Sequence, residues 1–166
     1  MSDKKISAKK LAELSLLTAL ALIIFVVELR IPDLSPVPGV KLGLSNIVTM
    51  YCLYRFRPWE TALVVSARVL LGAVFASSPV TLIYSAAGAF LCLAGMIPLS
   101  RLLPKLPIWL CSIIGAVLHN IGQVAAAVIY MGSFAPVYYL PVLLISGCVA
   151  GAFTGLCAHF VTARLR

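Results

Sequence analysis

One arginine inside an apolar segment is the residue of this chain that most needs a chemical explanation. Arg68 lies in ETALVVSARVLLGAVF, close to the middle of the segment 59–76. A charge among apolar residues is costly, and a guanidinium suits a carboxylate or a phosphate. We therefore expect Arg68 to anchor an anionic group of a substrate. The alternative is a structural ion pair with an acidic residue. Glu28 is the plausible partner, because Glu60 lies about two helical turns from the arginine and is a poor one.

A face of polar side chains follows in the segment 108–131. Residues three and four positions apart share one face of a helix. The face consists of Ala116, His119, Asn120, Gln123, Ala127 and Tyr130. Strongly polar groups in apolar surroundings need partners. We expect His119, Asn120 and Gln123 to orient the polar part of a ligand, and hydrogen bonds between helices are the alternative.

Small and aromatic residues extend this candidate pocket. The segment 79–99 places four of them on one helical face: Thr81, Tyr84, Ser85 and Gly88. Packing and pocket lining explain this pattern equally well. We expect Ser85 to line the pocket, and Tyr84, Tyr138 and Tyr139 to pack against the apolar or aromatic body of a ligand.

The segment RIPDLSPVPGVKLGLSN carries a second candidate anion site. Its prolines and glycines indicate a rigid, folded-back loop. Lys41 comes just before a helix, and Asn46 follows one turn inside it. A helix N-terminus with a nearby lysine attracts anions. We expect both residues to contact substrate, while a solvated lysine at a helix cap is the alternative for Lys41.

The acidic residues argue against catalysis. The chain has five, and no two lie within four positions of each other: Asp3, Glu13, Glu28, Asp33 and Glu60. A local magnesium site for diphosphate chemistry therefore cannot form. The sequence contains no GxSxG, HExxH or Walker A motif. We expect a protein without catalytic residues, metal or cofactor. The five cysteines lie in apolar segments without a CxxC pair and are expected to pack.

Composition indicates a membrane protein that positions these groups on helices. The chain has 166 residues, of which 62% are hydrophobic and 11% charged, against roughly 25% charged in soluble domains. Residues 69–100 and 106–163 contain no Asp, Glu, Lys or Arg. We expect an all-α integral membrane bundle that forms one domain over residues 1–166. Its six transmembrane helices are expected at about 11–29, 42–56, 59–76, 79–99, 108–131 and 138–163.

Basic residues gather on one side of this topology. That side carries Lys4, Lys5, Lys9, Lys10, Arg55, Arg57, Arg101, Lys105, Arg164 and Arg166, whereas the other side has Arg30 and Lys41. The positive-inside rule therefore places both termini in the cytoplasm. The net charge of +8 then reflects topology, and we expect no nucleic-acid partner.

Small residues at fourfold spacing mark two helices. Gly147, Gly151 and Gly155 form a doubled GxxxG, which we expect to pack within the chain. The first helix has two such pairs, Ala8 with Ala12 and Ser15 with Ala19. Either pair could dock another membrane protein, and the sequence does not choose between them.

Five ordered segments carry a resemblance to a known family. They are PGVKLGLSNIVTMY at 38–51, ARVLLG at 67–72, YSAAG at 84–88, HNIGQ at 119–123 and YYLPVLLISG at 138–147. Together they resemble the Gx transporter family, whose members are often labelled heptaprenyl diphosphate synthase component I. That family is similar to the substrate-binding S-components of energy-coupling factor (ECF) transporters. The resemblance implies six helices, an outward-facing pocket, and association with an ECF transmembrane subunit and two ATPase subunits.

The function we expect is substrate capture in a bacterial cytoplasmic membrane. The substrate would be a small amphipathic, anionic vitamin, quinone or isoprenoid precursor, taken from outside. One alternative is a solitary proton-coupled transporter that titrates Glu28 or His119. Others are a non-catalytic membrane component of a prenyl diphosphate synthase system and a pure scaffold. The synthase label fits the scattered acids poorly.

Overall fold

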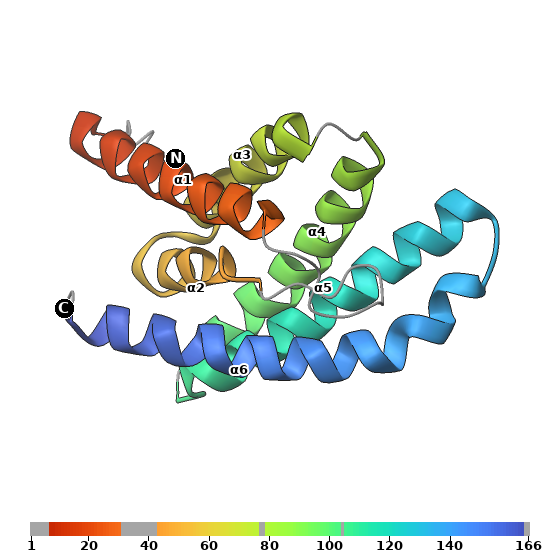
Figure 1. Cartoon of the computed structure of the whole chain (residues 1–166). Helices are drawn as coiled ribbons and strands as arrows, with labels where there is room; N and C mark the ends of the chain where they lie inside the picture. Colours follow the sequence, from red (N-terminus) through yellow and green to blue (C-terminus); the bar gives the residue numbers. More distant parts are fainter. Residues whose placement is uncertain (1–6, 31–42, 77–78, 104, 165–166) are drawn as a thin grey trace, which may run out of the picture.

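The computed structural model describes residues 7–30, 43–76, 79–103 and 105–164, and these are helical with no strand among them (Figure 1). The elements are α1 (Ala8–Arg30), α2 (Asn46–Arg55), α3 (Pro58–Ala76), α4 (Pro79–Leu102), α5 (Ile108–Met131), the short 3-10 helix η1 (Ala135–Tyr139) and α6 (Leu140–Arg164). The expected all-α membrane fold is confirmed.

Proline and glycine set several of the boundaries, as the sequence indicates. Pro58 occupies the first position of α3, where its missing N–H is not needed. Gly132 follows α5 with φ +60°, a left-handed conformation that glycine adopts without strain and that commonly ends helices. Pro107 precedes α5 in an extended conformation.

The second helix is shorter than expected. The sequence predicts a helix over 42–56, but α2 begins at Asn46 and has 10 residues. Gly43, with φ +65°, forms a turn in which its carbonyl accepts the Asn46 N–H at 2.9 Å. At about 1.5 Å per residue, α2 rises only about 15 Å and cannot span a hydrocarbon core of about 30 Å. It lies inside the protein, with Val48, Met50, Cys52 and Leu53 buried.

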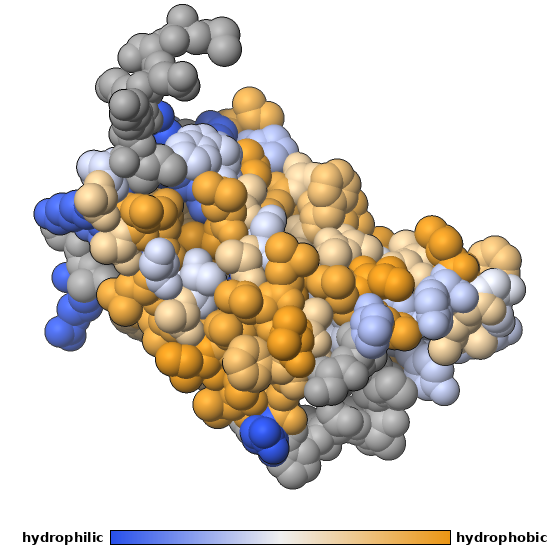
Figure 2. Space-filling model, turned by 90° about the horizontal axis from the view of Figure 1, so that it is seen from above, coloured by the Kyte–Doolittle hydropathy of each residue, from blue (hydrophilic) through white to orange (hydrophobic). Residues whose placement is uncertain are grey.

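Five of the remaining segments are long and apolar enough to cross a membrane. Many of their large apolar side chains point outward, among them Val74, Phe90 and Ile129. Figure 2 shows apolar residues spread over much of the visible face. Such a surface suits lipid, because apolar patches of this extent are unusual on a soluble monomer. The chain is therefore a multi-pass membrane protein.

The helices pack as two groups with α2 between them. In one group α1 contacts α3, and in the other α5 lies between α4 and α6. Contacts of α3 with α4 and of α2 with α6 join the groups. The five cysteines are free, and Cys52, Cys92 and Cys111 are buried in the packed interior.

Glycines allow α6 to lie directly against α5. A Cβ built on Gly151 would lie 2.8 Å from Ile113 Cα, and one built on Gly155 would lie 2.5 Å from Trp109 Cα. Both distances are to backbone, so a side chain there would force the helices apart. The expected packing of the doubled GxxxG within the chain is confirmed. By contrast Ala8, Ala12, Ser15 and Ala19 are all exposed on α1.

Candidate functional site

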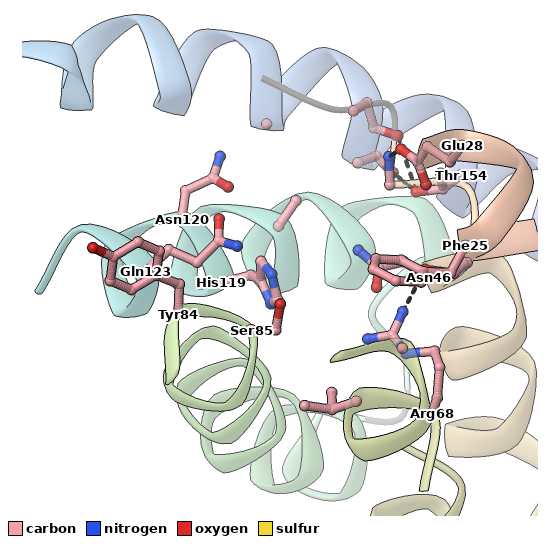
Figure 3. A pocket seen from close by; sticks show the side chains of 18 of the residues that line it. Phe25, Glu28, Asn46, Arg68, Tyr84, Ser85, His119, Asn120, Gln123 and Thr154 are labelled. Carbon is pink, nitrogen blue, oxygen red and sulfur yellow. Dashed lines mark hydrogen bonds between the residues drawn. The ribbon is translucent and has the colours of Figure 1, made fainter. Parts of the chain in front are cut away.

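A cavity of about 280 Å³ lies between the two groups of helices (Figure 3). Every helix from α1 to α6 contributes to its lining. Pockets for small molecules usually measure about 300–1,000 Å³, so this one suits a small ligand.

Arg68 brings a positive charge into this cavity from the centre of α3. Its side chain is 8% exposed, and its Nη1 donates a hydrogen bond to the hydroxyl of Ser45. Within the described part of the chain, Ser45 is the hydrogen-bond partner of this guanidinium, which has five N–H donors. Arg68 therefore keeps donors that a ligand could engage.

Glu28 brings a negative charge into the same cavity from the last turns of α1. Its side chain is 7% exposed, and Oε1 accepts a hydrogen bond from the Gly43 N–H. Glu28 and Arg68 do not form an ion pair. The ion pair of the described residues joins Lys10 Nζ to Glu60 Oε1 at 2.6 Å. Among the described residues, the direct ion pair with Glu28 that the sequence suggested for Arg68 is therefore not formed, although both side chains line the same cavity.

Neutral polar groups line the part of the cavity formed by α4, α5 and α6. His119, Asn120 and Gln123 all face it from α5, as the helical spacing predicts, and Tyr84 and Ser85 face it from α4. The α4–α5 crossing is close, because a Cβ on Gly88 would lie 2.9 Å from both His119 Cε1 and Gln123 Cγ. The structure thus gathers most of the candidate residues in one place.

Asn120 also serves the packing of the bundle. Its Nδ2 donates a hydrogen bond to the Leu143 carbonyl of α6 at 2.5 Å. This is the interhelical hydrogen bond considered above as the alternative role. The carboxamide oxygen of Asn120 has no such partner among the described residues and remains available to a ligand.

Several expected residues lie elsewhere. Tyr138 is 86% exposed, and neither it nor Tyr139 lines the cavity. Both belong to η1, which the sequence did not indicate and which turns the chain at the start of α6. Tyr130 is exposed as well, although its ring packs edge-on against that of Tyr84, with 6.1 Å between the ring centroids. Lys41 lies outside the described residues. Asn46 lines the cavity.

Other lining residues were not expected from sequence. Ser146, Gly147, Ala150, Gly151 and Thr154 line the cavity from one face of α6. Their spacing of three and four positions could have indicated a polar face beside the glycines. Phe25 lines the cavity from α1, and no local pattern distinguishes it from the other apolar residues of that helix.

The arrangement offers groups that can bind a ligand. The described lining residues offer two opposite charges, amides, hydroxyls and an imidazole. The described residues include no group of three or more His, Cys, Asp or Glu placed to hold a metal ion. A concave site with a few converging polar groups among small and apolar residues is typical of ligand recognition.

Comparison with known proteins gives one match. Residues 17–161 match the family model described as heptaprenyl diphosphate synthase component I. No curated protein and no solved structure matches.

Proposed function

This chain belongs to the heptaprenyl diphosphate synthase component I family, and we propose that it is a membrane-embedded substrate-binding subunit of an importer, similar to the S-components of ECF transporters. It captures a small amphipathic compound with an anionic group, of the vitamin, quinone-precursor or isoprenoid-precursor kind. It does so from outside, in a bacterial cytoplasmic membrane.

The buried guanidinium of Arg68 is the observation that carries this proposal. It lies at the centre of a helix long enough to span the membrane and borders a cavity lined by polar groups. A charge at that depth is retained where it binds a partner or a ligand. Ser45 is a neutral partner, so the positive charge of Arg68 is not balanced by direct contact.

Energy for import would come from partner subunits, because the chain has no nucleotide-binding motif. An ECF transmembrane subunit and two ATPase subunits are the partners we propose. The exposed small residues of α1, Ala8, Ala12, Ser15 and Ala19, are the proposed docking surface. Close helix contact through small residues is a common mode of association in membranes.

Mass spectrometry of small molecules released from the purified protein tests substrate capture. We expect a discrete anionic compound in the wild type that is lost in Arg68→Ala. Arg164→Ala, at an exposed arginine of α6, is the matched control and should retain it. A compound retained equally by Arg68→Ala, with its fold intact, would contradict the role of Arg68.

The family description favours a second candidate. A component of a heptaprenyl diphosphate synthase system would bind a soluble catalytic chain and transport nothing. Affinity purification from native membranes separates the two proposals. Co-purification of ATPase subunits supports the importer, whereas recovery of a prenyl synthase chain, without ligand in the cavity, supports the synthase component.

A further inference from the structure

Glu28 and Arg68, the acidic and basic residues among those described around the cavity, lie at one end of it. Glu28 comes from α1 and Arg68 from α3, and Figure 3 shows both at the same side of the cavity, with Asn46 and Phe25 between them in this view. They are not joined as an ion pair, and each has a hydrogen bond to the turn that precedes α2. Their formal charges sum to zero.

A purely anionic ligand fits this end poorly. An anion bound to Arg68 would leave one excess negative charge, because Glu28 borders the same small cavity. Uncompensated charge is strongly disfavoured in surroundings of low dielectric constant. A ligand that also carries a cationic group would restore neutrality by meeting the carboxylate of Glu28.

Among the residues that the structure describes, the opposite end of the cavity carries no carboxylate or guanidinium. Tyr84, Asn120 and Gln123 supply a hydroxyl and two carboxamides there. Such groups orient uncharged donors and acceptors. The described lining therefore has an ionic end, where Glu28 of α1 and Arg68 of α3 lie, and a neutral polar end, where Tyr84 of α4 and Asn120 and Gln123 of α5 lie.

We propose that the ligand is zwitterionic. An acidic group meets Arg68, a cationic nitrogen close to it meets Glu28, and an uncharged polar body reaches Asn120 and Gln123. The chemical class is therefore a small vitamin or precursor compound that carries an amino-acid-like pair of charges, which narrows the range of substrates proposed above. This inference rests on the proposed function, since it assumes that the cavity captures a small molecule.

The experiment compares Glu28→Gln and Arg68→Gln with the wild type. The glutamine at position 28 keeps an oxygen to accept the Gly43 N–H and removes only the charge. Compounds released from each purified protein are labelled separately with an amine-reactive and a carboxyl-reactive reagent before mass spectrometry. Glu13→Gln, exposed on the same helix α1, and Arg164→Gln are the matched controls, and Arg68→Lys tests whether charge alone suffices.

We expect one compound that reacts with both reagents. Glu28→Gln and Arg68→Gln should each lower its amount by about thirtyfold or more, as removal of one partner of a buried charge pair does, while both controls keep it. A compound with an acidic group only, lost in Arg68→Gln and kept in Glu28→Gln, overturns the zwitterion and leaves the proposed function intact. Loss of the compound in Lys41→Gln and Arg68→Gln, but not in Glu28→Gln, overturns the zwitterion equally. If a folded wild-type protein releases no compound at all, that result contradicts the proposed function itself.

Discussion

The guanidinium of Arg68 donates a hydrogen bond to the hydroxyl of Ser45. This contact joins the centre of α3 to the turn that starts α2, and both residues border the cavity. The same turn is held from α1 by the bond between Gly43 N–H and Glu28. The short helix α2 is therefore positioned by the two charged residues that we propose for the ligand.

Ser45→Ala should destabilise the protein. Ser45 is 3% exposed, so the substitution leaves a buried donor of Arg68 without its acceptor. We expect a loss of about 1–3 kcal/mol, measured by unfolding in detergent micelles. Ser15→Ala, at an exposed position on α1, is the control. Equal stability of the two variants would show that the bond contributes nothing to folding.

Substitution of Glu60 should reduce the stability of the protein more than substitution of its ion-pair partner Lys10. Glu60 is 1% exposed and also accepts the Arg57 N–H at 2.9 Å, whereas the Lys10 side chain is 34% exposed. Glu60→Ala removes the acceptor of the Arg57 N–H and the partner of the lysine, and should cost about 2–4 kcal/mol.

Lys10→Gln should cost no more than about 1 kcal/mol, because part of the lysine already reaches solvent. Thermal unfolding of both variants beside Glu13→Gln measures the difference. A larger loss for Lys10→Gln than for Glu60→Ala would show that the Arg57 N–H alone does not stabilise the buried carboxylate and that the lysine is required.

Two glycines offer a matched test of helix packing. A Cβ on Gly155 meets the Trp109 backbone at 2.5 Å, whereas the nearest atom to a Cβ on Gly95 is Cδ1 of the Leu118 side chain. A leucine side chain can rotate away, but a helix backbone cannot. We expect Gly155→Ala to cost about 1–3 kcal/mol or more and Gly95→Ala clearly less. Unfolding of the two variants in parallel checks this order.

The sequence correctly predicted those features that depend on the conformation of neighbouring residues, such as helix ends and shared helical faces. The α3 start at Pro58 and the α5 end at Gly132 follow from the conformations of proline and glycine. The positions of His119 and Gln123 on a shared face follow from helical geometry, which fixes direction along one element. The resemblance noted in the sequence agrees with the family that matches residues 17–161.

The remaining features depend on contacts between distant segments. Glu28 and Ser45 form hydrogen bonds between segments where α1, α2 and α3 meet. The spacing of residues within one helix cannot predict such contacts. Tyr138 points outward because η1 interrupts the helix expected over 138–163. The sequence predicted that the second helix begins at residue 42, but α2 begins at Asn46 because Gly43 adopts a positive φ, which the neighbouring residues do not indicate.

Two neighbouring amides of α5 should separate binding from stability. Gln123 lines the cavity and has no hydrogen-bond partner among the described residues, whereas Asn120 donates to the Leu143 carbonyl. Gln123→Ala should therefore reduce the amount of compound released from the purified protein and leave the unfolding midpoint nearly unchanged. Asn120→Ala should lower both, with a stability loss of about 1 kcal/mol from the interhelical bond. Paired unfolding and mass spectrometry on the two variants, with Ala127→Ser on the same helix as control, provide the measurement. If Gln123→Ala unfolds as readily as Asn120→Ala while retaining the compound, Gln123 supports packing and not the ligand.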